Sequence, residues 1–480
     1  MKKTFLVAMY CISSLLFGAG VAQAQTSVER LVTMGGLSEA FLNAPLPKVY
    51  NVGEAHWNYA GAVGAGDAAY ETLLNEGLGF YHVFHYIDAT RAFYQAMLLQ
   101  PNATLPRLGL AISVLKLAGD QNAALTAYKE YQNAQRLMLA NGGTVEEKFW
   151  VQFFGVYLEN LLGVDFSLPS KERIQDIYAG YTLKNTDVEY LVLGANMLSD
   201  LNVISLNDLK TNYTKAISLN PKHVGALHYM THVAEALDEK KDALEYGRLA
   251  ALYSPESSHI QHMYGHNLPI FGNWLEASAQ FVIADDLHQT WAADNNVPLT
   301  YDWHYTHNLF LWGYAQIGAG LDMDKALQTL VMSCQTEVHH CMTTFYAVVA
   351  YGDVTKAKEM IQVLNSNNQV AQADLFQQTL YWLGLEAGDA SGLQATYSSP
   401  RANFMYIVNE MLQGRDIPDT LAVQVQNALM AQLTRAGFDS WSQVLPMALL
   451  LRGTAQKVGN AKVLNVIDTV FQQINFRPQK

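Results

Sequence analysis

The sequence predicts an all-α protein, an α-solenoid of antiparallel helix pairs, and three observations lead to this class. A spacing of small and aromatic residues recurs every 34 residues, and proline stands where the second helix of a pair should end. Half of the 480 residues are hydrophobic, 15% are charged and 13 are proline. This composition argues against long disordered or low-complexity segments.

The repeated spacing consists mainly of small residues, with an aromatic residue at the middle position in three of its four copies and proline a few residues later in three. Its clearest copies are Leu209, Tyr213, Ala216 and Pro221; Ala243, Gly247, Ala250 and Pro255; Ala277, Phe281 and Ala284; and Ala89, Phe93, Ala96 and Pro101, the last preceded by Gly77 and Phe80. Small residues let two helices approach closely, and the aromatic ring fills the space between them. Each pair buries its apolar face only by stacking on its neighbours.

A 34-residue period with this spacing resembles the tetratricopeptide repeat (TPR), and the resemblance is strong for residues 70–290. We therefore expect a TPR array over residues 70–350 and a C-terminal TPR-like helical region over 351–480. Glycine and proline between residues 25 and 69 predict an irregular N-terminal segment laid against the first repeat.

Residues 1–24 predict a cleaved bacterial export signal. Lys2 and Lys3 form a basic start, an apolar run follows, and Ala22 and Ala24 are the small residues that a signal peptidase reads. We expect a periplasmic or secreted protein with no later membrane span. The formal charge of −13 argues against a nucleic-acid partner, which needs a basic surface.

Cys334 and Cys341 are the two cysteines that remain after removal of the signal, and they would enter an oxidising compartment. Seven residues apart on one continuous helix, their Cα atoms would lie about 10 Å from each other, too far for a disulfide. If residues 335–338 form a turn between antiparallel helices, the two can meet. The sequence favours a local disulfide, with two buried free thiols as the alternative.

Histidine is concentrated in the middle of the chain, where nine of the 14 fall between residues 223 and 307. Two sets follow the spacing of one helix face, namely His228, His232 and Glu235 in one repeat and His259, His262 and His266 in the next. The second set repeats two positions of the first one period later, so neighbouring helices present the same stripe. A further candidate helix near Tyr301 adds His304, His307 and Asn308.

Two imidazoles at i and i+4 on one helix can chelate a single metal ion. We predict that one transition-metal site, for zinc or copper, is formed by His228, His232, His262 and His266, with His259 and His307 as further members. Glu235 is a candidate ligand, a residue that orients a histidine, or a solvated charge.

The histidine blocks resemble those of a broad group of largely uncharacterised bacterial TPR proteins. The blocks here are His228-Tyr229-Met230-Thr231-His232, then His259-Ile260-Gln261-His262-Met263-Tyr264-Gly265-His266, then His307-Asn308, and the resemblance covers about residues 65–315. Tyr86 stands where that group usually has a histidine, which leaves His82 and His85 outside the residues that the resemblance assigns. The resemblance implies the fold and the place of the site, and no settled activity comes with it.

Other histidines are read as structural. His56, His223, His288 and the pair His339-His340 lie off the stripe, and a lone helical histidine usually satisfies hydrogen bonds in the core or at the surface. The stripe itself has a structural alternative, which is a hydrogen-bonded polar ladder between helices or a pH-sensitive peptide groove.

Three hypotheses for function remain. The first is a metal-binding solenoid for sequestration, structure or sensing. The second is a scaffold whose concave groove grips a peptide or partner protein. The third is a metal-dependent enzyme with an open coordination position. Repetition of histidine at matched positions favours a metal over a peptide, and the sequence does not decide whether there is catalysis.

Overall fold

Helices joined by short turns make up nearly all of the computed structural model. It describes residues 42, 50–118, 121–161, 168–299, 302–397, 403–437, 441 and 444–478. No strand is present in these ranges, where the one isolated β-bridge joins Glu54 to His223. The all-α class is therefore confirmed. The predicted export signal at residues 1–24 lies outside the described residues.

The chain forms two compact units, which are described separately here. The first contains the described residues up to Leu237 together with Glu245–Ile260 and Trp291–Val297; the second contains Asp238–Leu244, Gln261–Thr290 and the described residues from Pro298 onward. Three helices have residues in both units, namely α13 (Lys240–Tyr253), α14 (Ser258–Asn267) and α15 (Trp274–Asn295).

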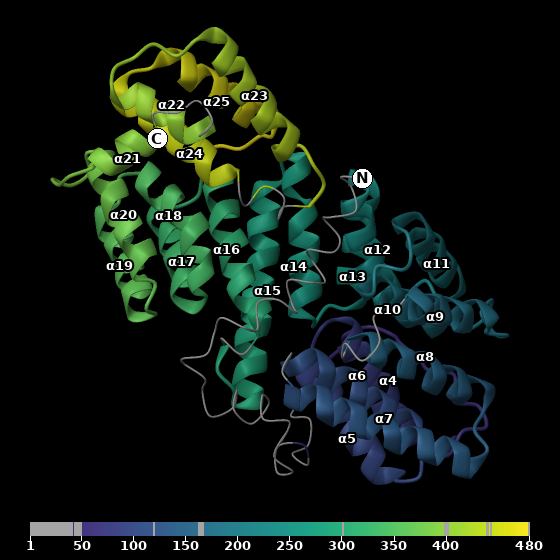
Figure 1. Cartoon of the computed structure of the whole chain (residues 1–480). Helices are drawn as coiled ribbons and strands as arrows, with labels where there is room; N and C mark the ends of the chain where they lie inside the picture. Colours follow the sequence, from purple (N-terminus) through teal and green to yellow (C-terminus); the bar gives the residue numbers. More distant parts are fainter. Residues whose placement is uncertain are drawn as a thin grey trace. The chain divides into compact units, whose positions relative to one another are not determined.

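Consecutive helices of the first unit pack against one another in pairs (Figure 1). They are α4 (Ala68–His82), α5 (Tyr86–Leu99), α6 (Leu105–Ala118), α7 (Gln121–Asn141), α8 (Val145–Leu161), α9 (Leu168–Gly180), a π-helical turn at Tyr190–Gly194 with α10 (Ala195–Asp200), α11 (Leu206–Leu219) and α12 (Val224–Ala236). Side-chain caps mark the start of several helices. The Asp67 carboxylate accepts hydrogen bonds from the backbone N–H groups of Ala69 and Tyr70 and so caps α4.

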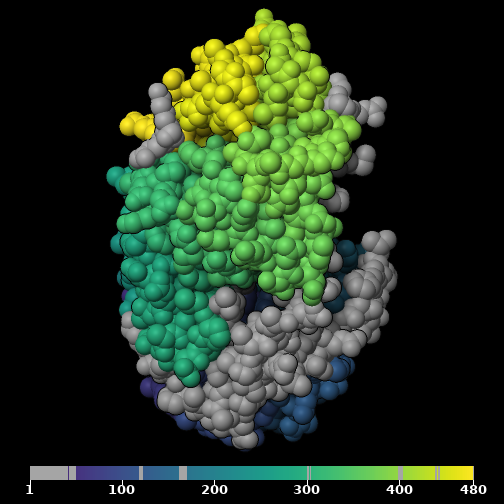
Figure 2. Space-filling model, turned by 90° about the vertical axis from the view of Figure 1, so that its left-hand side faces the viewer, coloured from purple at the N-terminus to yellow at the C-terminus, as the bar shows by residue number. Residues whose placement is uncertain are grey.

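The second unit continues with the same kind of helix pairing. Its helices are α16 (Trp303–Gly318), α17 (Met323–Thr336), α18 (Cys341–Ala350), α19 (Val354–Ser366), α20 (Val370–Trp382), α21 (Ser391–Thr396), α22 (Asn403–Leu412), α23 (Asp419–Leu433), α24 (Leu445–Val458) and α25 (Ala461–Gln473), with 3-10 turns at Pro269–Phe271 and Val338–His340. Figure 2 shows residues of α16 to α20, teal to light green, packed side by side.

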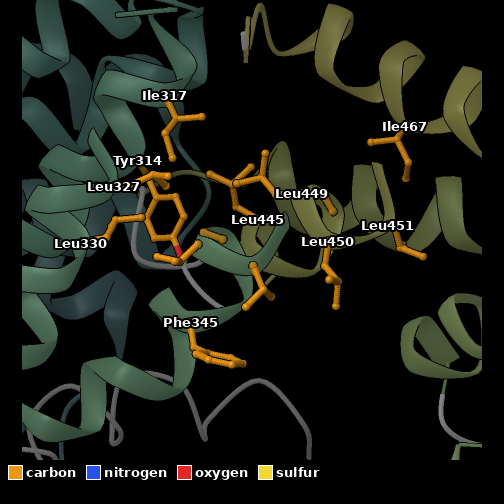
Figure 3. Packing of buried hydrophobic residues seen from close by; sticks show 14 of the residues in the cluster. Tyr314, Ile317, Leu327, Leu330, Phe345, Leu445, Leu449, Leu450, Leu451 and Ile467 are labelled. Carbon is orange, nitrogen blue, oxygen red and sulfur yellow. The ribbon is translucent and has the colours of Figure 1, made fainter. Parts of the chain in front are cut away.

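The C-terminal helices share a core with the helices before them. Leu445 and Leu449 of α24 lie beside Tyr314 of α16, and all three are buried in one apolar cluster (Figure 3). Helix α24 also packs against α18 and α25. The region predicted as C-terminal and TPR-like is therefore helical and belongs to the second unit, although its core continues back to α16.

The 34-residue spacing corresponds to buried positions between packed helices. Its small and aromatic members are all buried, in α11, α13 and α15 as well as in α5. Glycine permits the neighbouring helices to approach the ring of Phe93 closely, because a Cβ on Gly77 or Gly109 would lie 2.6 or 2.4 Å from that ring. The structure is thus a TPR-like α-solenoid of antiparallel helix pairs. None of the described helices is long and apolar enough to span a bilayer.

Candidate metal centre

Three imidazoles meet in the first unit, and we call them the first histidine group: His228, His232 and His259. His228 and His232 lie one turn apart on α12, and His259 lies near the start of α14. The Nε2 atom of His228 is 3.1 Å from Nε2 of His232 and 2.9 Å from Nε2 of His259. His228 and His259 are buried, whereas His232 is half-buried.

The proton on His228 is placed by its other nitrogen. Nδ1 of His228 lies 2.6 Å from the backbone carbonyl oxygen of His82, and a carbonyl can only accept, so Nδ1 carries the hydrogen. His82 is the last residue of α4, where helix carbonyls have no partner within the helix. In the neutral ring, Nε2 of His228 therefore has no proton and presents a lone pair to the group.

His232 is oriented in a similar way. Its Nδ1 lies 3.5 Å from Oε2 of Glu235, three residues further along α12. A carboxylate on this side favours the proton on Nδ1 and leaves Nε2 for the group. The structure thus places Glu235, one of the predicted candidates, behind His232.

The lone pair on Nε2 of His228 therefore faces two further nitrogens, Nε2 of His232 and Nε2 of His259. A single N–H donor from His232 or His259 could use the Nε2 lone pair of His228, but two donors could not share it well. A cation between the three atoms would accept a lone pair from each. Ligands about 2.0–2.1 Å from a tetrahedral zinc lie roughly 3.3 Å from one another, close to the spacing found here.

A second histidine group of the same construction lies in the second unit: His262 and His266 on α14, and His307 on α16. Nε2 of His262 is 2.7 Å from Nε2 of His266, and the ring centre of His307 is 5.0 Å from that of His262 and 5.7 Å from that of His266. His262 and His266 are buried, and His307 is half-buried.

Asn308 fixes His262 as the His82 carbonyl fixes His228. The side-chain amide of Asn308 donates to the backbone carbonyl of Phe281 at 2.9 Å, which turns its Oδ1 toward Nδ1 of His262, also at 2.9 Å. Nδ1 of His262 therefore donates, and its Nε2 again presents a lone pair. Gly265 allows this packing, because a Cβ there would lie 2.8 Å from the ring of Phe281.

The grouping differs from the prediction of one site built on His228, His232, His262 and His266. The structure gathers the five stripe histidines and His307 into two groups, each within one unit. Each i, i+4 pair takes its third imidazole from the second helix further along the chain, α14 for the pair on α12 and α16 for the pair on α14. The role of these residues as metal ligands stays a prediction, and His304 lies in neither group.

Sequence reasoning missed two carboxylates, one buried and one partly buried, that hold histidines in place. In the first unit, Oε2 of Glu189 lies 2.9 Å from Nε2 of His82, and its Oε1 lies 2.9 Å from Nε2 of His223. Nδ1 of His223 accepts the backbone N–H of Ala226 at the start of α12, so Nε2 of His223 donates to the carboxylate. His82 and His223 are thus held by one carboxylate, and these three side chains also lie close enough together to hold a metal ion, so the structural role expected for His223 stays a prediction.

The pKa values of this cluster reflect burial and charge together. Burial lowers the pKa of the His82 imidazole, against the pull of the Glu189 carboxylate. Burial alone would raise the pKa of Glu189, but the imidazoles of His82 and His223 outweigh it and hold that pKa well below its usual range. Glu189 is thus ionised and acts as a double acceptor, directly before the π-helical turn at Tyr190–Gly194.

A similar cluster begins α16 in the second unit. Asp302 caps the helix by accepting the backbone N–H of His304 at 2.9 Å, and its carboxylate lies 2.8 Å from Nδ1 of His304 and 3.1 Å from Nδ1 of His288. Burial opposes ionisation, yet the two imidazoles hold the pKa of Asp302 well below its usual range. His288 and His304 therefore contact the Asp302 carboxylate and are not members of the second histidine group.

Cys334 near the end of α17 and Cys341 at the start of α18 form a disulfide, with Cα atoms 4.5 Å apart. The chain turns between them through the 3-10 segment Val338–His340. Nδ1 of His340 lies 2.8 Å from Oγ of Ser333, and His339 is exposed beside Glu337.

No family model and no curated protein sequence matches this chain. Among solved structures it is similar to yeast Tom70, with a TM-score of 0.35, 12% identity, and coverage of 88% of this chain and 82% of that one. It is also similar to the TPR domain of P58(IPK), with a TM-score of 0.25, 11% identity, and coverage of 85% and 98%. Both scores are low, so the fold assignment depends on the helix pairs and the buried 34-residue spacing.

Proposed function

We propose that this chain is a TPR-like helical scaffold that binds two transition-metal ions, zinc or copper, one in each histidine group. We further propose that it is exported and acts in the periplasm or outside the cell. The bound metal would then serve sequestration, sensing or structural stabilisation. One observation carries the proposal: an Nε2 atom of His228 that bears no proton faces two further imidazole nitrogens at 2.9 and 3.1 Å.

Two features support a metal over a polar ladder. The fixed oxygens behind His228 and His262 leave an acceptor nitrogen pointing into each group, and in the first group two further ring nitrogens face that single lone pair, whereas a ladder supplies one donor for each acceptor. The same construction also occurs twice, at positions one repeat apart. Neutral imidazole suits zinc and copper, and the partners behind the rings are the kind that orient metal ligands.

The ligand set leaves room for one more partner. Zinc held by three protein nitrogens generally takes a fourth ligand from solvent or from a bound molecule. The residues of the chain would bind and orient the ion, with His82 and Asn308 holding the central imidazoles and Glu235 holding His232.

Metal titration of untagged, chelator-stripped protein tests the proposal. The parent should bind two equivalents of Zn²⁺, and His228→Ala and His262→Ala should each bind one, with their helical circular dichroism unchanged. His56→Ala in the first unit and His339→Ala in the second are matched controls, because both histidines are exposed and outside the groups. These controls should keep two equivalents.

Two results would contradict the proposal. If the parent binds no zinc or copper at micromolar protein, the imidazoles form a structural ladder or contact a peptide. If His228→Ala and His262→Ala still bind two equivalents, the ions lie elsewhere in the chain.

A further inference from the structure

The turn after α4 has a backbone conformation that is unusual for the residue it contains. The backbone N–H of His85 donates to the carbonyl of Phe80 at 2.9 Å, and the N–H of Phe84 donates to the carbonyl of Tyr81 at 3.1 Å. These two bonds define the Schellman motif that ends many helices. Phe84 occupies its left-handed position, with φ of 65°.

Glycine is the residue that favours this position, because it has no Cβ to crowd the following carbonyl. A bulky residue with positive φ is an outlier that persists only where its surroundings hold it. The chain uses glycine at other helix ends, for example Gly459 after α24 with φ of 74°. Phenylalanine at residue 84 is therefore costly for the turn itself, which points to a role for its ring.

The ring of Phe84 lies over the first histidine group. Its centre is 4.7 Å from the ring centre of His228, in an edge-on arrangement, and 4.9 Å from that of His259. Tyr229 and Tyr86 lie around it at 6.2 and 5.7 Å. Phe84 is half-buried, so part of its surface is exposed while its ring packs against the two buried imidazoles.

The same turn holds His228 from behind. The carbonyl oxygen of His82, two residues before Phe84, accepts the Nδ1–H of His228 at 2.6 Å. Gly225 on α12 permits this approach, because a Cβ there would lie 2.6 Å from Cγ of His82. One turn thus supplies both the oxygen that places the lone pair of His228 and the ring that covers two of the three imidazoles.

We propose that Phe84 is a positioning residue of the first metal site, held in the left-handed conformation so that its ring shields the bound ion from water and slows its release. This inference rests on the proposed function. An apolar cover around a metal site limits the access of solvent and of competing ligands, and residues in this surrounding layer commonly change metal affinity by about 10–100-fold. The role assigned to Phe84 is kinetic and acts through His228 and His259.

The test measures zinc release to an excess of a coloured chelator, in a His262→Ala background where only the first group is left to bind. Phe84→Gly and Phe84→Ala should both release Zn²⁺ about tenfold faster than this parent or more, since both lack the ring. Phe84→Tyr, which keeps the ring, should restore slow release. Substituting cobalt for zinc should show a changed visible spectrum for the two ringless variants only.

Thermal unfolding of the metal-free proteins separates this role from core packing. Phe84→Gly should be more stable than Phe84→Ala, because glycine relieves the left-handed backbone while both lose the same ring. Faster release from both variants with this order of stability supports the proposal. Release as slow as in the parent, from variants that still bind one equivalent, overturns it and leaves the proposed metal site standing. If the His262→Ala parent binds no Zn²⁺, the proposed function fails for the first group, and this inference fails with it.

Discussion

Replacing Glu189 with glutamine should lower the free energy of unfolding of the metal-free protein by about 2 kcal/mol. The carboxylate accepts one hydrogen bond from Nε2 of His82 and one from Nε2 of His223, each at 2.9 Å, and all three side chains are buried. Hydrogen bonds to a charged group contribute about 1.5–3 kcal/mol and neutral ones about 0.5–1.5 kcal/mol. Loss of the charge therefore costs about 1 kcal/mol for each bond.

Glutamine can keep both hydrogen bonds through one rearrangement. His223 must keep its proton on Nε2, because its Nδ1 accepts the N–H of Ala226, so the amide oxygen would face His223. The amide NH₂ would then donate to Nε2 of His82, whose proton moves to Nδ1 beside the hydroxyl of Tyr229 at 3.1 Å. Alanine offers no such solution. Glu189→Ala leaves two buried N–H donors without an acceptor and should cost about 4 kcal/mol.

Urea unfolding followed by circular dichroism, with free energies from the midpoint and slope, measures the difference. Glu172→Gln on α9 is the matched control, because Glu172 is exposed in the same unit and should change stability by less than about 0.5 kcal/mol. A loss for Glu189→Gln no larger than for this control would refute the account of the cluster.

The same carboxylate predicts a pH dependence. The pKa of Glu189 is held below its usual range in the fold, so the unfolded chain binds more protons than the folded one as pH falls. Its contribution is complete above the unfolded pKa of about 4.3 and is lost below it. The pKa of His82 is also lowered by burial, so stability should already begin to decline below about 6.5. Glu189→Gln should remove only the more acidic of these two declines; an unchanged profile below pH 4 would contradict this assignment.

Three further outcomes are expected. Asp302→Asn should cost about 1–3 kcal/mol, whereas Asp322→Asn should cost under about 0.5 kcal/mol. Both residues cap helices and asparagine caps equally well, but only Asp302 also holds two histidines; equal losses in urea unfolding would count against that role. Thiol titration of the denatured, unreduced mature protein should find no free thiol from Cys334 or Cys341, and two titrated thiols would contradict the bridge. Intact-mass measurement of exported protein should give Gln25 as the first residue, and retention of the first 24 residues would refute export.

The helix pairs were predictable because the 34-residue spacing corresponds to buried contacts. Phe281, for example, packs where Gly265 leaves room for its ring, and such small-aromatic complementarity is visible in sequence. The histidine stripe was also visible. Its division into two groups was not, because His259 and His307 join their groups from different helices and their spacing does not follow the repeat.

The residues that hold the histidines in place are harder to recognise in the sequence. Glu189 meets His82 from 107 residues away, and nothing in its neighbourhood in the sequence marks it as an acceptor for two histidines. The backbone carbonyl of His82 has no side-chain signature at all. The left-handed conformation of Phe84 is likewise hidden, because sequence reasoning expects glycine at that position. These features depend on the packing of distant helices rather than on local pattern.

Anomalous scattering from crystals of the zinc-loaded protein, measured on both sides of the zinc absorption edge, tests the central claim most directly. The account predicts two peaks, one within each histidine group, each about 2.0–2.1 Å from a ring nitrogen of each of its histidines. A single peak shared by His228, His232, His262 and His266, or no peak at either group in crystals that contain zinc elsewhere, would contradict it.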